Sequence, residues 1–354
     1  MRRKRGSVLS NYLELAKPRI TLLVLVTAAA GFYLASPHSV QWLSLLHLLA
    51  GTALVAGGTN AMNQVLERAV DGRMARTRRR PLPAGRLAAP PAAAFAITLG
   101  VLGVAYLAVA VNGLTAALAA ATFLIYDFLY TPLKPVHPLA TLVGAVPGAL
   151  PIAGGWAAAR GELGPGAWAL FGLLFFWQLP HFLALAWLFR RDYEAAGLKM
   201  LSVRDPDGIR TRQQAFLYTL TLLPVSLLPA FVGLTGHLYF FSAGALGVGF
   251  VIWASLFLRR PSQAAARRLF RFSLAYLPLV LGALVFDKAA PGERIAQGPE
   301  RGAVSYAANE PARAPAGEPG TALDVASGGA SPRFLHPVRG AVRPVSETTA
   351  EVNA

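Results

Sequence analysis

The sequence predicts an all-α integral membrane protein with about nine transmembrane helices. Three observations predict this fold class. Of the 354 residues, 55% are hydrophobic, with a mean hydropathy of +0.47. Apolar runs of about 18 or more residues recur along the chain, and lysine and arginine collect in alternate loops. The absence of cysteine excludes disulfides, thiolate metal ligands and cysteine nucleophiles.

Each apolar run is long enough to cross the hydrocarbon core of a bilayer. The first run has no small-residue cleavage site and other spans follow it, so it predicts a retained span and not a cleavable signal peptide. The predicted spans are 20–36, 42–63, 88–109, 112–130, 138–158, 167–189, 215–235, 237–258 and 269–286.

The basic residues fall on one side of these spans. When alternate loops are assigned to opposite sides, 25 lysines and arginines lie with the N-terminus, and Arg160 alone lies in the opposite loops between spans. This asymmetry predicts a cytoplasmic N-terminus in a multi-pass protein of the cell inner (plasma) membrane. It also explains the net charge of +16 without nucleic acid as a partner.

The sequence divides into a membrane domain, 1–287, and a tail, 288–354. The tail is rich in Ala, Pro, Gly and Glu and lacks apolar periodicity, so it cannot bury enough surface to offset its ordering entropy. We expect it to be disordered. After an odd number of spans it should lie on the periplasmic or extracellular side.

Three oxygen-bearing side chains form a pattern at the end of the second span. Asn63, Glu67 and Asp71 are four residues apart, which places them along one stripe of a helix. Mg²⁺ prefers oxygen ligands and shares them with substrate phosphates. Ionisable groups at a membrane boundary are costly and tend to mark function.

An arginine-rich stretch follows at once, from Arg73 to Arg80. Guanidinium groups fit phosphate oxygens as forked donors, so the carboxylates and arginines together predict a metal-bridged diphosphate site. The alternative is a basic loop that only fixes membrane orientation, which any single arginine could do.

The stretch "NQVLERAVDGRMARTRRRPLP" resembles the first signature of the protoheme IX farnesyltransferases (heme O synthases), within the membrane-embedded aromatic prenyltransferase superfamily. Other stretches agree with this family in order and spacing. They are "KPRI" at 17–20, "YTPLK" at 130–134, "GAVPGALPIAGGW" at 144–156, "WQLPHFLALAW" at 177–187 and "RRDYEAAGLKMLSV" at 190–203.

The resemblance implies nine helices in a ring around a central cavity, with active-site loops on the cytoplasmic side. It also implies transfer of a farnesyl group from farnesyl diphosphate to a vinyl group of heme B, giving heme O. Mg²⁺ would be the cofactor and heme B a substrate, and heme A synthase or oxidase assembly factors would be candidate partners. The alternatives are a relative that uses a quinone-precursor or chlorophyll-type acceptor, and a transporter or heme-handling factor.

The resemblance also implies roles for individual residues. Asn63, Glu67 and Asp71 would hold the metal, and Asp192 would contribute a second acidic group. This second acidic pattern is incomplete. Ala196 stands four residues after Asp192, and Arg191 precedes Asp192, where acidic residues would be expected. The residues expected to bind diphosphate are Arg76, Arg78, Arg80 and Lys134, and those expected to line the site are Tyr130 and Tyr193.

His181 lies inside the sixth predicted span, beside Pro180. A histidine within the bilayer is a functional candidate, and imidazole is a common ligand of heme iron. The alternative is a histidine that is hydrogen-bonded to a neighbouring helix.

Overall fold

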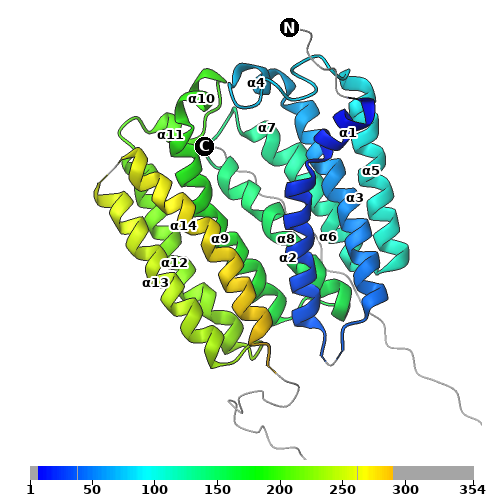
Figure 1. The fold of residues 1–354 in the computed structure, drawn as a ribbon, viewed down its shortest axis with the longest axis vertical. Coiled ribbons are helices and arrows are strands. Elements are labelled where there is room, and N and C mark those ends of the chain that lie inside the picture. Colours follow the sequence, from blue (N-terminus) through cyan, green and yellow to red (C-terminus); the bar gives the residue numbers. More distant parts are fainter. Residues whose placement is uncertain (1–6, 38, 261, 290–354) are drawn as a thin grey trace, which may run out of the picture. The chain divides into compact units, whose positions relative to one another are not determined.

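The computed structural model describes residues 7–37, 39–260 and 262–289, which belong to one compact unit, Met1–Gln297 (Figure 1). The tail expected to be disordered lies outside the described residues from 290 onward. Within the described ranges the regular secondary structure is helical, apart from one isolated bridge between Thr235 and Lys288.

The described chain contains nine helices of membrane-spanning length and hydropathy, as the sequence predicts. The fourth span is continuous through three segments, α6 (Gly113–Leu124), the π-helix η1 (Ile125–Tyr130) and α7 (Thr131–Leu133). The other eight are α2 (Pro18–Ala35), α3 (Trp42–Leu66), α5 (Ala89–Ala110), α8 (Ala140–Arg160), α9 (Pro165–Leu188), α12 (Ile209–Phe231), α13 (His237–Arg259) and α14 (Gln263–Phe286).

Two spans begin about two turns earlier than predicted, at Ile209 and Gln263. Their first two turns carry arginines, which end an apolar run but do not end a helix. Ser262 caps α14 by accepting a hydrogen bond from the amide of Ala265 at 3.0 Å. Hydropathy therefore locates the membrane segment, and the cap locates the start of the helix.

The nine spans form a closed circuit. Each span packs against the next along the chain, and α14 returns to α2. Just after α14, the ammonium of Lys288 donates to the carbonyls of Tyr33 and Ser36 at 2.6 Å each, at the end of α2. This agrees with the expected ring of helices.

Across the circuit, α2 packs closely against α8 (Figure 1). Glycines make this approach possible, because a Cβ on Gly31 would lie 2.0 Å from the carbonyl oxygen of Ile152. A Cβ on Gly155 would lie 1.9 Å from the carbonyl oxygen of Ala28. Small residues at such contacts let helix backbones meet in a membrane.

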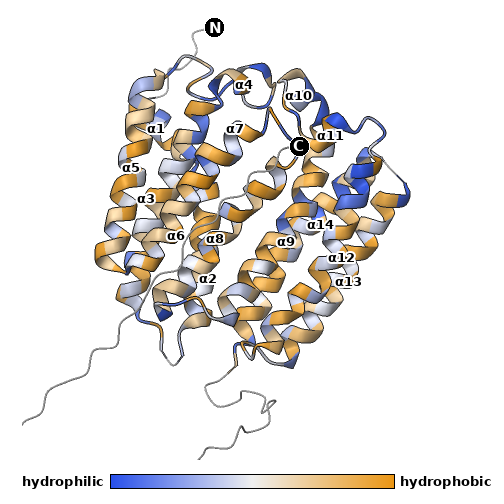
Figure 2. Cartoon of the chain, turned by 180° about the vertical axis from the view of Figure 1, so that it is seen from behind, coloured by the Kyte–Doolittle hydropathy of each residue, from blue (hydrophilic) through white to orange (hydrophobic). Residues whose placement is uncertain are grey.

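Hydrophilic residues gather at one end of the bundle, around α4 (Arg68–Arg73), α10 (Arg190–Ala195) and α11 (Leu201–Arg204) (Figure 2). The short helix α1 (Val8–Ala16) lies at the same end (Figure 1). The arginine-rich stretch and the loop after the sixth span therefore share one face of the molecule.

Candidate active site

The acidic motif lies where α3 gives way to α4. Glu67 alone separates the two helices, yet the backbone keeps a four-residue step, since the amide of Glu67 donates to Asn63 O and the amide of Asp71 donates to Glu67 O. The three side chains therefore stay in one neighbourhood, as their spacing predicts. Asn63 and Asp71 are almost fully buried.

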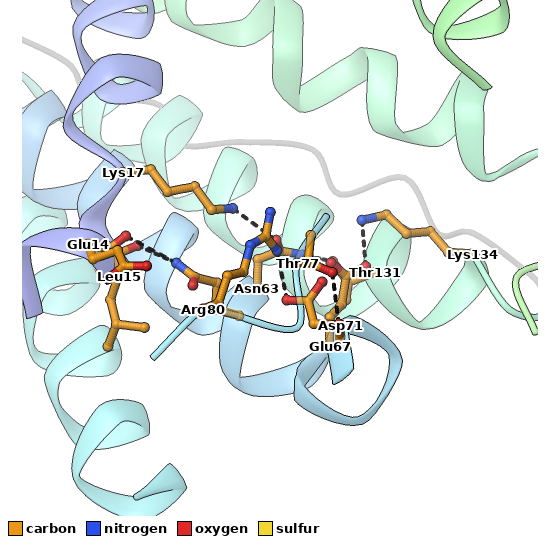
Figure 3. A network of polar contacts seen from close by, with 11 residues as sticks. Glu14, Leu15, Lys17, Asn63, Glu67, Asp71, Thr77, Arg80, Thr131 and Lys134 are labelled. Atoms are coloured by element: carbon orange, nitrogen blue, oxygen red, sulfur yellow. Dashed lines mark hydrogen bonds and ion pairs between the residues drawn. The ribbon is translucent and has the colours of Figure 1, made fainter. Parts of the chain in front are cut away.

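Each of the three side chains faces a cation (Figure 3). Lys134 Nζ lies 2.7 Å from Glu67 Oε1, and Arg80 NH1 lies 2.7 Å from Asp71 Oδ2. Lys17 Nζ donates to Asn63 Oδ1 at 3.3 Å. The cations come from three places in the chain, namely the corner between α1 and α2, the end of α7 and the loop after α4.

Further hydrogen bonds orient the motif. Asn63 Nδ2 donates to Thr131 Oγ1 at 3.1 Å, which directs the amide oxygen toward Lys17 (Figure 3). Thr77 Oγ1 donates to the backbone carbonyl of Asp71 at 2.9 Å and holds the loop against α4. Asp71 Oδ1 is buried and has no hydrogen-bond partner among the described residues. A buried carboxylate oxygen of this kind is available to a ligand.

The motif lines a polar cavity of about 260 Å³, which an apolar cavity of about 310 Å³ adjoins. Ile20, Tyr126 and Phe182 line both. The polar cavity contains Lys17, Asn63, Glu67, Asp71, Arg76, Arg80, Tyr130, Lys134 and Tyr193.

The apolar cavity runs deeper into the bundle between α2, α3, α6 and α8. Its wall on α3 extends from Asn60 to Leu48, about 18 Å along the helix axis. The two cavities together present charged groups at one end and a long apolar space at the other.

The π-helix η1 supplies the aromatic rings where the cavities meet. Tyr126 and Tyr130 lie on this segment with ring centroids 5.0 Å apart, and Lys134 Nζ lies 4.2 Å from the centre of the Tyr130 ring. π-helical turns are often found at functional sites. No pattern in the sequence predicts this turn.

The pKa values of Lys17 and Lys134 are shifted in opposite directions. Burial lowers the pKa of Lys17 to about 8, and Arg80 adds to this effect. Burial acts in the same direction on Lys134, but the carboxylate of Glu67 and the neighbouring tyrosines outweigh it, so the pKa of Lys134 is raised. Lys134 is therefore firmly cationic at neutral pH.

The predicted diphosphate-binding arginines divide into two groups. Arg76 and Arg80 line the polar cavity, and the guanidinium of Arg76 lies 5.0 Å from the centre of the Phe189 ring. Arg78 is exposed and does not line this cavity.

Asp192 and His181 lie away from the acidic motif. Asp192 lines a neighbouring pocket with Arg190, Arg191 and Arg267, and the structure does not bring it into the polar cavity. His181 faces α14, with Nδ1 2.7 Å from Ser273 Oγ and its ring stacked on Trp177.

The residues that the sequence interpretation missed are Lys17 and Thr131. Lys17 opens the "KPRI" stretch, but its position there marks it only as one of the basic residues before the first span. Its separation of 46 residues from Asn63 left no local sign of their contact. Thr131 follows Tyr130 in the "YTPLK" stretch, so it could have been found there.

The donor set fits a divalent cation that is shared with a diphosphate. Within the described residues there is no group of three or more His, Cys, Asp or Glu side chains suited to a metal ion. Two carboxylates and one amide are fewer donors than a protein-only site needs, but Mg²⁺ keeps waters and takes phosphate oxygens. The orphaned Asp71 Oδ1 is the atom best placed for such an ion.

The sequence profile described as the UbiA prenyltransferase family matches residues 24–277. The chain belongs to this family. It is therefore a multi-pass membrane prenyltransferase. The nine spans found in the described part of the chain all overlap the matched region.

Curated relatives in this family carry a more specific name. The chain is 42% identical over 287 residues to the protoheme IX farnesyltransferase of Solibacter usitatus, covering 78% of this chain and 98% of that one. It is 44% identical over 280 residues to the protoheme IX farnesyltransferase of Salinibacter ruber, covering 79% and 99%.

Solved structures share the fold. A digeranylgeranylglyceryl phosphate synthase superposes with a TM-score of 0.69 at 18% identity, over 79% of this chain and 98% of that one. A UbiA homologue from Archaeoglobus fulgidus, bound to DMAPP and Mg²⁺, gives a TM-score of 0.56 at 17% identity, over 78% and 99%.

Proposed function

We propose that this protein transfers the farnesyl group of farnesyl diphosphate to a vinyl group of heme B, giving heme O and diphosphate. The observation that carries the proposal is the junction at Ile20, Tyr126 and Phe182, where a cation-rich cavity meets a long apolar one. A prenyl diphosphate has the same division into an anionic head and an apolar chain. The curated relatives' name supports farnesyl as the chain and heme as the acceptor.

At the polar end, Lys134, Arg76 and Arg80 bind the diphosphate oxygens, and Asn63, Glu67 and Asp71 would hold Mg²⁺. When bound, the ion supplies Lewis-acid neutralisation of the charge that collects on the departing diphosphate. The A. fulgidus homologue bound to DMAPP and Mg²⁺ supports this choice of cofactor.

In the reaction, the carbon–oxygen bond of the farnesyl group breaks and its electron pair leaves with the diphosphate. The allylic cation then forms at the junction, where the π faces of Tyr126, Tyr130 and Phe182 favour positive charge. The apolar walls keep water from the cation until the vinyl carbon has attacked it. Water then adds to the new cation and releases a proton, which gives the hydroxyl group of the product.

We place heme B on the α9 side of the polar cavity, where Leu185, Ala186 and Met200 form an apolar wall close to Tyr193. His181 is the candidate contact to the heme. Ser273 Oγ donates to Phe270 O at 2.7 Å, so the same oxygen accepts from His181 Nδ1–H. This tautomer leaves the lone pair of Nε2 free of a proton, which iron ligation requires.

A spectrum of the purified protein with added heme B would test the role of His181. We expect His181→Ala to shift the Soret band and weaken heme binding. His137→Ala is the control, because His137 Nδ1 accepts a hydrogen bond from the nearby backbone amide of Leu139 at 3.1 Å, and this variant should leave the spectrum unchanged. Identical spectra for the wild type and His181→Ala would remove His181 from the heme site.

We further propose that the polar face is cytoplasmic and that the protein resides in the inner (plasma) membrane. The grouping of α4, α10 and the arginine-rich stretch at one end of the bundle supports this orientation (Figure 2). Enzymes or assembly factors that use heme O for terminal oxidases would be its partners.

Pigment extraction from cells with and without the gene tests the function. Reversed-phase chromatography should show a heme more hydrophobic than heme B only when the gene is expressed, and cells expressing Asp71→Asn serve as the matched control. If the heme profile is the same while a quinone precursor becomes prenylated, the acceptor in this proposal is wrong.

A further inference from the structure

The pocket that Asp192 shares with three arginines lies at the hydrophilic end of the bundle, beside α10 (Figure 2). We call it the arginine pocket. It has a volume of about 480 Å³ between the end of α9, α10 and the start of α14, and its charged residues are Arg190, Arg191, Asp192 and Arg267. Three guanidinium groups against one carboxylate leave two positive charges in excess.

None of the three arginines is paired with a carboxylate within the described residues. Arg190 donates to the backbone carbonyl of Pro206 at 3.2 Å, and its guanidinium lies 4.5 Å from the centre of the Trp187 ring. Arg191 and Arg267 are exposed. Because guanidinium forks match carboxylate geometry, these two side chains are available to an anionic ligand of that kind.

The arginine pocket and His181 lie along the same contact between α9 and α14. On α14, Arg267 lines the pocket, the ring centroid of Phe270 lies 4.8 Å from that of His181, and Ser273 Oγ lies 2.7 Å from His181 Nδ1. These three positions are three residues apart, so they share one face of α14.

The distance between the pocket and His181 follows from the rise of the two helices. Arg267 and Ser273 are separated by about 9 Å along α14, and Leu188, which lines the pocket, lies about 10 Å from His181 along α9. This separation is close to that between the iron of a heme and its propionate groups.

Phe189 separates the arginine pocket from the polar cavity. Its side chain lines the pocket, and the guanidinium of Arg76, which lines the polar cavity, lies 5.0 Å from the centre of its ring. Phe182 follows His181 directly and lines both cavities, so the level of His181 is also the level of their junction. A flat ligand beside α9 can therefore extend from the arginine pocket toward the junction.

We propose that the arginine pocket binds the two propionate groups of heme B, with Arg191 and Arg267 as the principal donors. The two excess positive charges match the two carboxylates. The vinyl groups lie across the macrocycle from the propionates, so this anchoring directs them toward Phe182 and the allylic cation. The inference rests on heme B as the acceptor in the proposed function, and it adds the orientation of that acceptor.

Binding of heme B and of its dimethyl ester to the full-length protein in lipid nanodiscs tests the inference. The ester keeps the iron and the vinyl groups but lacks both propionate charges. We expect Arg191→Gln and Arg267→Gln each to weaken heme B binding about tenfold, the size of one charge-assisted contact, and to bind the ester within about twofold of the wild type. Soret-band titrations, with empty nanodiscs as the blank, give both affinities.

Arg268→Gln is the matched control, because it removes the same charge from the next residue. Arg268 does not line the arginine pocket, and its guanidinium lies 6.0 Å from the centre of the Trp253 ring on α13. It should bind heme B within about twofold of the wild type. An equal loss of heme B binding in Arg268→Gln, or an equal loss of the ester in Arg267→Gln, would overturn the inference.

Kinetics distinguish the arginine pocket from the diphosphate site. Arg267→Gln should raise the KM for heme B about tenfold and leave the KM for farnesyl diphosphate unchanged. Native mass spectrometry tests an anionic lipid as the occupant. If the wild type retains phosphatidylglycerol, Arg267→Gln loses it, and both bind heme B equally, the pocket holds a lipid headgroup and the inference is overturned.

The pigment extraction described above keeps this inference apart from the proposed function. Formation of heme O together with unchanged heme B binding in Arg267→Gln would reject the propionate site alone. No heme B binding by the wild type, together with prenylation of a quinone precursor, would reject heme as the acceptor and the propionate site with it.

Discussion

The two groups of spans in this protein are packed in different ways. The spans of the first group, α2, α3, α5, α6 and α8, surround the apolar cavity and line it mainly with threonines, aliphatic side chains and small residues. The spans of the second group, α9, α12, α13 and α14, enclose large side chains that are fully buried, among them Tyr239, Phe250, Phe257 and Tyr276. We refer to them as the cavity group and the packed group.

The difference indicates that the packed group mainly stabilises the ring and that the cavity group provides space for a ligand. In a membrane, helices associate through close packing and hydrogen bonds, because lipid offers no hydrophobic driving force. The packed group obtains this packing from aromatic side chains. The cavity group obtains it from backbone approach at Gly31 and Gly155, which leaves space beside the contact for a ligand. Substitutions in the two groups should therefore affect different measurements.

The largest expected effect concerns the two carboxylates that line the polar cavity. We expect Asp71→Asn and Glu67→Gln each to lower the turnover of the folded protein more than about a hundredfold, since each removes a carboxylate from the diphosphate end of the cavity. Asp205→Ala is the comparison, in the loop just before α12 of the packed group. Asp205 accepts hydrogen bonds from the amide and hydroxyl of Thr211 at 2.7 and 2.8 Å, so its loss should cost about 1 kcal/mol of stability and no turnover. Heme O yield per folded protein and thermal melting give both readouts.

A smaller effect on turnover should distinguish Arg80 from Arg78, which lie in the same loop after α4. Arg80→Lys should lose about ten- to a hundredfold in turnover, because lysine keeps the charge but not the forked geometry. Arg78→Lys should change turnover less than about twofold, since Arg78 is exposed and outside the polar cavity. Both variants keep the charge that sets orientation, so membrane insertion should be equal. A loss of similar size in Arg78→Lys would show that the exposed arginine also reaches the substrate.

One substitution placed in each group tests the comparison itself. Ala119→Leu fills part of the apolar cavity, so we expect the KM for farnesyl diphosphate to rise about tenfold while the melting temperature is kept. Ala243→Leu inserts the same atoms into a site that is 1% exposed in the packed group, which should cost about 1–3 kcal/mol of stability and leave KM unchanged. If Ala119→Leu lowers the melting temperature and leaves the KM for farnesyl diphosphate unchanged, the apolar cavity does not bind the farnesyl chain.

The smallest expected effect concerns Asp127 on the π-helix. It is fully buried, and neither carboxylate oxygen has a hydrogen-bond partner among the described residues. Asp127→Asn removes an ionisable group from this position, and we expect a gain of about 1 kcal/mol, seen as a melting temperature a few degrees higher. A lower melting temperature would mean that the carboxylate contributes to stability where it lies.

The number of spans and their order could be read from the sequence, because each depends on a long apolar run that needs no partner to be recognised. The clustering of Asn63, Glu67 and Asp71 could be predicted for a similar reason, because the backbone keeps their four-residue spacing across the break between α3 and α4. The start of α12 could not, because it depends on the left-handed Gly208 and the Asp205 cap and not on hydropathy.

Contacts between distant segments account for the remaining differences at the site. Lys17 and Asn63 lie 46 residues apart, and His181 and Ser273 lie 92 apart, so neither pairing has a local pattern. The placement of Arg78 and Asp192 outside the polar cavity depends on loop conformations that residue spacing does not encode.

The contact of Lys288 with the end of α2 joins the last span to the first. Its hydrogen bonds to Tyr33 and Ser36 connect positions 255 and 252 residues apart. The chain is synthesised from its N-terminus, so α2 enters the bilayer first. The hydrogen bonds from Lys288 can form only after α14 has been synthesised and inserted. The ring can therefore close only after the nine spans of the described chain have been inserted into the membrane. A truncated chain would expose the free edge of α2, which quality-control proteases of the membrane could recognise.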